Sequence, residues 1–185
     1  AREAKIVQID IDQTELEKTK SMVDISFNCD AGDFITNLVS YLEQQKISIT
    51  QPYEWYETCN GYRNRYPFIG PEHEDKNGFI NSYKFMDQIS NYLKKDQIVV
   101  TDMGTGLLSG HQALRIKQGQ RLMTSTGLGE MGYGLPGAIG ASFARNKGEV
   151  LCLNCDGGMM MNLQEIQTLV HHQLPIKLFI FNNDG

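Results

Sequence analysis

The sequence has 185 residues, enough for one domain of ordinary size and part of a second. Asp and Glu outnumber Lys and Arg by 22 to 17, and a net charge of −5 argues against a protein that binds nucleic acid through its phosphates. A hydrophobic share of 41% excludes a disordered chain, yet no apolar run approaches the roughly 20 residues that cross a bilayer. With four cysteines and no signal-peptide pattern, we expect a cytoplasmic protein with reduced thiols and no membrane partner.

The first half of the chain predicts a small α/β segment followed by a connection. A strand is expected at 6–10, and Phe34, Leu38 and Leu42 fall at helical spacing, which predicts an amphipathic helix over about 33–45. From 46 to 78 this periodicity is lost, and aromatic residues mix with prolines and charges. We interpret that stretch as a linker or long loop, with the charge run at 72–76 as solvated surface.

The second half alternates strands with helices. Strands are expected at 98–101, 150–153 and 176–181, and helices at 82–93, 135–144 and 162–170. Ser82 is the expected N-cap of the first of these helices, and Asn162 with Glu165 resembles a capping box at the start of the last. Such alternation predicts a parallel sheet with right-handed crossovers, whose ligands bind beyond the carboxyl ends of the strands. Because the last strand has nothing after it to cover it, we expect a fragment of a longer protein.

The strongest chemical pattern combines Asp156, Asn183 and Gly185. Asp156 ends one predicted strand and Asn183 ends the next, 27 residues later, so a helical crossover brings both to one edge of the sheet. Gly185 adds a main-chain carbonyl on the same side of an extended segment. A carboxylate, an amide oxygen and a carbonyl suit Mg²⁺, which takes its other ligands from water and from phosphates. Gly157 and Gly158 lack a Cβ, so their N–H groups could hold those phosphates.

A glycine cluster contains two overlapping GxGxxG patterns, at 127–132 and 132–137. Asp156 follows 19 residues after Gly137, close to the spacing of an acid that binds ribose in dinucleotide-binding folds. However, the residues before the cluster barely predict a strand. A glycine-rich turn with tight helix–sheet packing is therefore the favoured interpretation of the pattern.

A third motif, hydrophobic-Asp-x-Asp-x-Thr, contains Asp10, Asp12 and Thr14 after the first predicted strand. Phosphatases of the haloacid-dehalogenase type use such acids as nucleophile and acid/base, with a later acid cluster that binds Mg²⁺. The segment at 155–160 resembles only half of that cluster, because Met159 and Met160 stand where acids are needed. Acids that merely cap the next turn are the simpler interpretation.

Cys152 and Cys155 form a CxxC pair without a second pair of ligands. Cys152 lies inside an apolar predicted strand, where a zinc or redox site is not expected. The pair is therefore interpreted as small, buried apolar side chains.

Residues 98–185 resemble the diphosphate-binding domain of thiamine-diphosphate-dependent enzymes, and are most similar to acetolactate synthase large subunits and their 2-oxo-acid decarboxylase relatives. Residues 4–18 look like the end of the central domain of that family. The matching segments of the second half lie at 99–104, 125–136, 138–141, 156–165 and 174–183.

The resemblance implies an α/β fold, a doubly wound parallel sheet that is truncated and preceded by the tail of a second α/β domain. Residues 1–45 would be the C-terminal part of the central domain, 46–78 a linker, and 79–185 an incomplete thiamine-diphosphate-binding domain.

By the same resemblance, Asp156, Asn183 and the Gly185 carbonyl hold Mg²⁺, which bridges the cofactor diphosphate. Met131 is the wedge that bends the cofactor, and the Gly129 carbonyl contacts its aminopyrimidine ring. The other cofactor-binding positions implied are Gly104, Thr105, Gly157 and Gly158.

The implied activity is decarboxylation of pyruvate or a similar 2-oxo acid with carboligation, as in branched-chain amino acid biosynthesis, or decarboxylation without ligation. The catalytic Glu of the family belongs to a pyrimidine-binding domain and is absent from this sequence, so we expect these residues alone to be inactive. The parent would be a homodimer or homotetramer with active sites shared between subunits, and FAD in the parent is compatible with the resemblance.

The sequence departs from the family at two places. Cys155 stands where the family has Gly, and its Cβ is expected to crowd the strand end and weaken cofactor binding. Gly104-Thr105-Gly106-Leu107 replaces Gly-Gln-His-Gln, which leaves only the Thr105 hydroxyl for those contacts. A cofactor-binding but catalytically silent relative is therefore a further hypothesis, alongside an Mg²⁺-dependent phosphatase with Asp10 as nucleophile.

Overall fold

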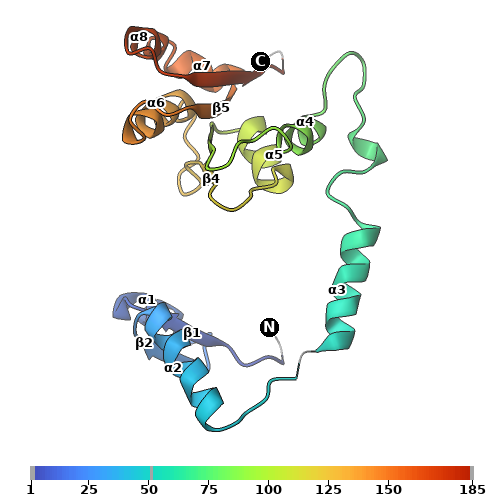
Figure 1. Ribbon diagram of the computed structural model, residues 1–185, viewed down its shortest axis with the longest axis vertical. Coiled ribbons are helices and arrows are strands. Elements are labelled where there is room, and N and C mark those ends of the chain that lie inside the picture. The colour runs from blue at the N-terminus through green and yellow to red at the C-terminus, as the bar shows by residue number, and fades with distance from the viewer. Residues whose placement is uncertain (1–2, 51, 184–185) are drawn as a thin grey trace. The chain divides into compact units, whose positions relative to one another are not determined.

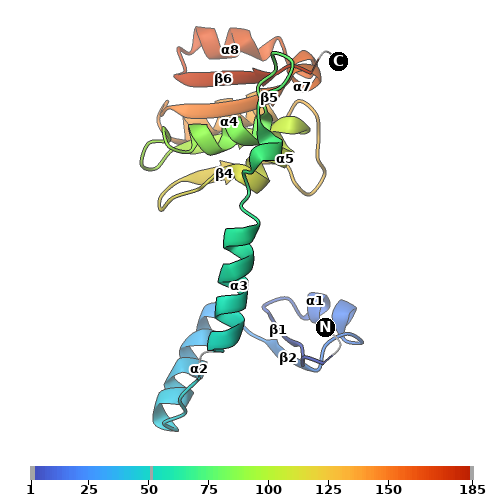
Figure 2. The ribbon, with the colours of Figure 1, turned by 90° about the vertical axis from the view of Figure 1, so that its right-hand side faces the viewer.

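The protein is described by a computed structural model at residues 3–50 and 52–183. It divides into two compact units, Ala1–Cys59 and Asn60–Gly185, and the division falls within helix α3 (Tyr53–Arg65). Figures 1 and 2 show the elements of each unit from two directions. No helix in the described part of the chain has the length and apolar character that crossing a membrane requires.

The first unit is built on a pair of parallel strands. Its elements are β1 (Val7–Asp10), α1 (Gln13–Thr19), β2 (Ile25–Asn28) and α2 (Ala31–Gln44), with Val7 opposite Ile25 and Asp10 opposite Asn28. The predicted helix at 33–45 is confirmed, although it begins earlier because the Asp30 carboxylate accepts the N–H groups of Gly32 and Asp33. Helix α1 and strand β2 were not predicted, since seven and four residues are too few to show a periodic pattern.

The stretch interpreted as a linker contains more regular structure than its sequence indicated. It includes α3 and the short 3₁₀ helix η1 (Pro71–His73). The side chains of α3 are exposed, apart from a half-buried Asn60, so the helix has no apolar stripe from which it could be recognised. Its role as a linker stays a prediction.

The second unit contains a four-stranded parallel sheet, as predicted. The strands lie in the order β4-β3-β5-β6, and all neighbouring pairs are parallel. Their bounds are β3 (Ile98–Thr101), β4 (Arg121–Met123), β5 (Val150–Cys155) and β6 (Ile176–Phe181). The strands at 98–101 and 176–181 match the prediction, whereas β5 is two residues longer and β4 was not expected to be regular. All four strands end at the same edge, which therefore positions the site.

Helices cover both faces of this sheet (Figure 1). They are α4 (Ser82–Ile89), α5 (Thr105–Ala113), α6 (Gly134–Ala144), α7 (Asp156–Met161) and α8 (Glu165–His171). Val99 and Leu151 pack with Met86 and Ala113 of α4 and α5, while Val100 packs on the opposite face with residues of α6. Burial on both faces explains why β3 and β5 read as continuous apolar runs instead of alternating patterns.

Both predicted helix caps of this unit are wrong. Asn81 caps α4, because its side-chain oxygen accepts the N–H groups of Tyr83 and Lys84, and Ser82 is the first helical residue. No capping box forms at Asn162, whose side-chain amide donates to the carbonyl of Gly132 at 2.7 Å. The chain instead makes two short helices, α7 and α8, with Asn162 at the end of the first and Gln164 before the second.

Candidate functional site

The predicted meeting of Asp156 and Asn183 is seen at the carboxyl edge of the sheet. Asp156 follows β5 as the first residue of α7, and Asn183 follows β6. The Asp156 carboxylate accepts the N–H of Asn183 at 3.1 Å through one oxygen and the N–H of Gly157 at 2.7 Å through the other. Gly185 lies outside the described residues. The parallel sheet thus brings the first two residues together, and their role as metal ligands stays a prediction.

The donors at this edge are those that a hard divalent cation requires. The described residues contain no group of three or more His, Cys, Asp and Glu side chains that could hold a metal. A cation here would therefore combine the half-buried Asp156 carboxylate with amide and carbonyl oxygens and with oxygens of water or phosphate. Mg²⁺ is usually bound in this way, so the residues fit the ion that the sequence predicted.

The turn after Asp156 consists of two glycines, of which Gly158 leaves no room for a side chain. A Cβ on Gly158 would lie 1.4 Å from a carboxylate oxygen of Asp102, a distance at which no side chain fits. A Cβ on Gly157 would lie 2.9 Å from the Cε atom of Met131, so the Met131 side chain lies directly beside this turn. Gly157 is half-buried and Gly158 is buried, so the turn packs closely against Asp102 and Met131, and its role as a phosphate-binding turn stays a prediction.

The glycine cluster is a tight loop and not a dinucleotide fingerprint. Gly129 and Gly132 have φ angles of +69° and +90°, the left-handed region that glycine tolerates. The N–H groups of Gly132 and Gly134 donate to the buried carboxylate of Asp102, at 2.8 and 3.3 Å. Since these N–H groups are already satisfied inside the protein, they are not available to a pyrophosphate, and the GxGxxG alternative is not supported.

Met131 lies in this loop with half of its surface accessible, 52%, so it is not a core methionine. The neighbouring Gly129 packs against Met103, because a Cβ there would approach the Met103 sulfur and methyl to 3.3 and 3.2 Å. The predicted wedge and the predicted phosphate turn are therefore side by side, while their contacts with a cofactor stay predictions.

A cavity of about 640 Å³ opens next to Asn183 and Thr105. Thr105 is the first residue of α5, and Gly104 before it has a φ of +95°. The opposite wall comes from the segment before α4, including Glu72, Glu74 and Lys76. These charges are exposed, as the sequence predicts for solvated surface, and no local pattern reveals that the fold places them beside a strand end.

Cys155 does not strain the strand end in the way the sequence suggested. Its φ and ψ of −108° and 158° are those of ordinary extended backbone. Its sulfur accepts the N–H of Gly106 at 3.4 Å, and a Cβ on Gly104 would lie 3.3 Å from it, so the glycines after β3 leave room for the thiol.

Both thiols of the CxxC pair are protonated at neutral pH. Burial, assisted by the negative charge of Asp102, raises the pKa of Cys152 to about 12. Burial also raises the pKa of Cys155, and the N–H of Gly106 opposes that shift. Neither residue has the thiolate character of a redox or zinc site, which agrees with their interpretation as apolar side chains.

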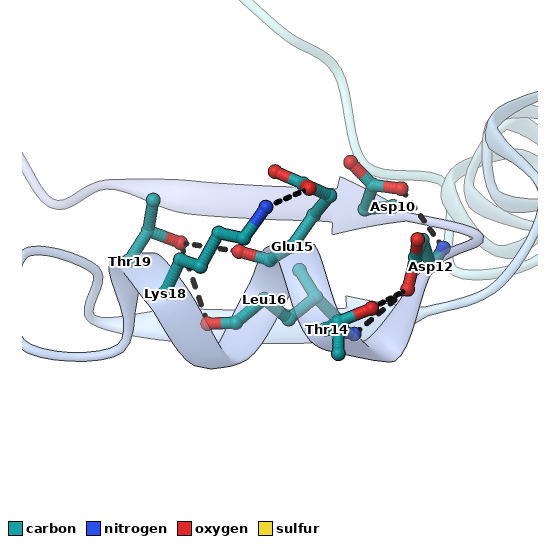
Figure 3. A network of polar contacts seen from close by, with 7 residues as sticks. All are labelled: Asp10, Asp12, Thr14, Glu15, Leu16, Lys18 and Thr19. Atoms are coloured by element: carbon teal, nitrogen blue, oxygen red, sulfur yellow. Dashed lines mark hydrogen bonds and ion pairs between the residues drawn. The ribbon is translucent and has the colours of Figure 1, made fainter.

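The acids of the phosphatase-like motif serve local structure (Figure 3). Asp12 caps α1 by accepting the N–H of Thr14 at 2.8 Å and its hydroxyl group, and Asp10 accepts the N–H of Asp12 at 2.9 Å. The hydrogen bonds from Thr14 hold the pKa of Asp12 below its ordinary value. Residues 155–160, the expected acid cluster, belong to the other unit, where they form the end of β5 and most of α7. The phosphatase alternative is not favoured.

Asp102 is a polar residue of this region to which no sequence pattern assigns a role. It follows β3 directly, and it is fully buried. The only sequence signal was an acid immediately after an apolar strand, which also describes Asp10 and therefore does not identify a site.

Comparisons with known proteins agree with this arrangement. Residues 102–185 match the family described as thiamine pyrophosphate enzyme, C-terminal TPP binding domain. The acetolactate synthase isozyme 1 large subunit of Escherichia coli is 32% identical over 182 residues, which cover 98% of this chain and 31% of that protein. The acetolactate synthase large subunit of Porphyra purpurea is 33% identical over 181 residues, 97% of this chain and 30% of its own length. The chain thus spans about a third of the length of these relatives.

Proposed function

We propose an activity for the whole protein from the family to which this chain belongs through residues 102–185, the thiamine-diphosphate-dependent enzymes. The protein decarboxylates pyruvate or a similar 2-oxo acid and joins the product to a second 2-oxo acid, as an acetolactate synthase does. The hydrogen bond between Asp156 and Asn183 carries the proposal, because it assembles the predicted metal-binding edge from segments 27 residues apart. Similarity to acetolactate synthase large subunits over 97% or more of the chain supports this activity in particular.

In this proposal the residues of the second unit bind and orient the cofactor. Asp156 and Asn183 hold Mg²⁺, and the glycine turn at 157–158 lies beside the diphosphate. Met131 fills the space beside that turn and imposes the shape of the bound cofactor, while the Gly129 carbonyl and the Thr105 hydroxyl contact its rings or the substrate. When bound, thiamine diphosphate supplies the electron sink for loss of CO₂. The contribution of these side chains is therefore proximity and orientation.

By the resemblance, the proton-transferring Glu of the family belongs to another domain, so no acid near this edge is assigned that role, including Glu72 and Glu74 of the cavity wall. Glu165 accepts the hydroxyl hydrogen of Thr168 at 2.8 Å, Glu130 accepts that of Ser125, and Asp156 accepts two backbone N–H groups. We therefore expect this Glu to come from a pyrimidine-binding domain outside these 185 residues, and we expect the 185 residues alone to turn over no 2-oxo acid.

The assembly and the other cofactor follow from the same proposal. The relatives are named large subunits, which supports an oligomeric protein whose active sites are shared between subunits. FAD in the whole protein, a cytoplasmic location and a place in branched-chain amino acid biosynthesis remain predictions that rest on the resemblance alone.

The test is product analysis with the full-length protein, pyruvate, thiamine diphosphate and Mg²⁺. One acetolactate for each CO₂ released, abolished by Asp156→Ala, is the expected result. Acetaldehyde as the only organic product would identify a decarboxylase without ligation. Cofactor binding without CO₂ release would identify the silent relative that the missing Gln-His pair suggests, and release of phosphate from an aryl phosphate, abolished by Asp10→Asn, would restore the phosphatase.

A further inference from the structure

Asp102 is a buried carboxylate that the proposed function does not yet use. Its exposed fraction is 0%, and it lies directly after β3 at the edge where the site forms. Removing a carboxylate from water costs several kcal/mol, so such a group persists only where its neighbours compensate it. A buried ionisable group is weak evidence for stability. The role of Asp102 therefore depends on which loops it holds in place.

One oxygen of Asp102 fixes the loop that carries Met131. This oxygen accepts the N–H of Gly132 at 2.8 Å and the N–H of Gly134 at 3.3 Å. Gly132 follows Met131 directly, and Gly134 begins α6. Asp102 is fully buried, so water does not compete for these two hydrogen bonds. The position of the Met131 backbone is thus tied to the end of β3.

The other oxygen of Asp102 faces the turn that follows Asp156. It has no hydrogen-bond partner among the described residues, and a Cβ on Gly158 would lie 1.4 Å from it. Gly158 is itself buried. The carboxylate therefore occupies the space between the two loops, with hydrogen bonds to one and direct packing against the other.

From this geometry we propose that Asp102 is a positioning residue that sets the distance between the Met131 loop and the 156–158 turn. This inference rests on the proposed function, in which the turn holds the diphosphate and Met131 acts on the ring end of the same molecule. A ligand that spans both loops depends on their relative position, whereas a ligand that contacts only the turn does not. Displacements of about 1 Å at such sites cost as much as 100-fold in rate.

The experiment uses this difference between ligands. The full-length protein and its Asp102→Asn variant are titrated calorimetrically with thiamine diphosphate and, separately, with inorganic diphosphate, both with Mg²⁺. Asn keeps the size of the side chain but exchanges the carboxyl group that holds Gly132 and Gly134 for an amide, whose NH₂ group then lies against Gly158. We expect the Kd for thiamine diphosphate to rise at least tenfold and the Kd for inorganic diphosphate to change less than twofold.

Ser142→Ala is the matched control. Ser142 is fully buried in α6, in the same unit, and loses a single hydrogen bond, from its hydroxyl to the carbonyl of Gly148 at 2.9 Å. Both Kd values are expected to remain at the wild-type level in this variant. A merely structural role of Asp102 would weaken both ligands together, and that result would overturn the proposal, as would unchanged affinity for thiamine diphosphate.

A second variant, Asp102→Ser, keeps the proposal testable if Asp102→Asn does not fold. Asp102→Ser leaves room for a water molecule that accepts the N–H of Gly132, and the same split between the two ligands is expected. If neither variant folds while Ser142→Ala does, Asp102 is a folding residue and the proposal is wrong. Wild-type protein that binds neither ligand would contradict the proposed function itself, whereas a loss confined to the Asp102 variants concerns Asp102 alone.

Discussion

Two strands of this molecule, β1 and β5, each have an Asp at the carboxyl end after a mostly apolar run, but the acids at these ends make different hydrogen bonds. At the end of β1, Asp10 and Asp12 each accept a backbone N–H from two residues further along. At the end of β5, Asp156 also accepts the N–H of Asn183, which follows the neighbouring strand. All three acids accept an N–H from their own turn, but only Asp156 also accepts one from a distant segment, which brings a second strand end beside it.

The two units that contain these strand ends also differ in how much of their interior is buried. Leu16 is the only buried residue among the described residues of the first unit. The sheet of the second unit is buried on both faces, and Val99, Val100 and Leu153 have no exposed surface. Precise placement of polar groups requires rigid support, which only the second unit provides among the described residues.

The largest expected effect is on cofactor affinity, which should depend on the acid at the end of β5 and not on the acid after β1. Asp156→Ala in the full-length protein should weaken Mg²⁺-dependent binding of thiamine diphosphate at least about 100-fold, because loss of a direct ligand exceeds the 10–100-fold cost of losing an outer-shell partner. Asp12→Ala should leave that affinity unchanged. Calorimetric titration with and without Mg²⁺ measures both, and equal wild-type affinity in the two conditions would contradict the metal site.

The next effect compares the two cores. Leu153→Ala should lower the free energy of unfolding by about 2–5 kcal/mol, the range for leucines in a close-packed interior, because Leu153 lies in the cluster with Met86 and Val99. Leu16→Ala should cost less than about 2 kcal/mol, since a thinly covered site collapses around the missing atoms. Guanidinium unfolding measures both variants. An equal cost would show that the first unit is packed as tightly as the second.

A smaller effect depends on pH and tests the burial of the sheet. The folded protein keeps the thiol proton of Cys152 up to about pH 12, whereas an unfolded chain releases it near the ordinary pKa of 9.0. The unfolded state then binds fewer protons, so this thiol stabilises the fold fully below pH 9 and progressively less as the pH rises toward 12. The loss is at most about 1.4 kcal/mol per pH unit for one group.

Cys152→Ala removes this contribution and serves as the comparison with the wild-type protein. At pH 7 the variant should be less stable by about 1 kcal/mol, the typical cost of a single substitution, and the difference should shrink above pH 9. Urea unfolding at intervals from pH 7 to 11 provides the measurement. A difference that stays constant over that range would show that the Cys152 thiol titrates normally.

The smallest effect is expected at Cys155, where the sequence indicated crowding. Because the backbone there is extended and the glycines at 104 and 106 accommodate the sulfur, Cys155→Gly should change the Kd for thiamine diphosphate less than twofold. Calorimetry on the full-length protein tests this. A clearly tighter complex would show that the thiol does obstruct the cofactor, as the sequence suggested.

Much of the fold could be predicted because the relevant patterns are local. Buried strands such as 98–101 and 176–181 are apolar runs of the right length, and alternation with helices implies that they are parallel. Short or exposed elements were missed, because α1 has seven residues and α3 lacks an apolar face. The predicted caps failed where a local choice existed, as at Ser82 and Asn81, or where a distant contact intervened, as at Asn162.

Part of the candidate site could likewise be predicted from the sequence, and part could not. The pairing of Asp156 with Asn183 followed from the sequence, because a crossover between neighbouring parallel strands has a predictable length and brings their ends together. The roles of Asp102 and of the cavity segment at 72–82 did not, since Asp102 contacts residues 30 and 32 positions away, and the other wall of that cavity includes Asn183.

The sequence by itself determined the buried strands of the second unit, that its sheet is parallel, and that Asp156 and Asn183 meet at its carboxyl edge beside a glycine turn. The sequence predicts that Asp12 caps a turn and that Asp156 meets the next strand, whereas only the tertiary structure shows that Asp102 is buried between two loops. The physical reason is that an Asp after a strand is the same group in all three places. Its function depends on which N–H donors the rest of the chain delivers to it and on how far water is excluded.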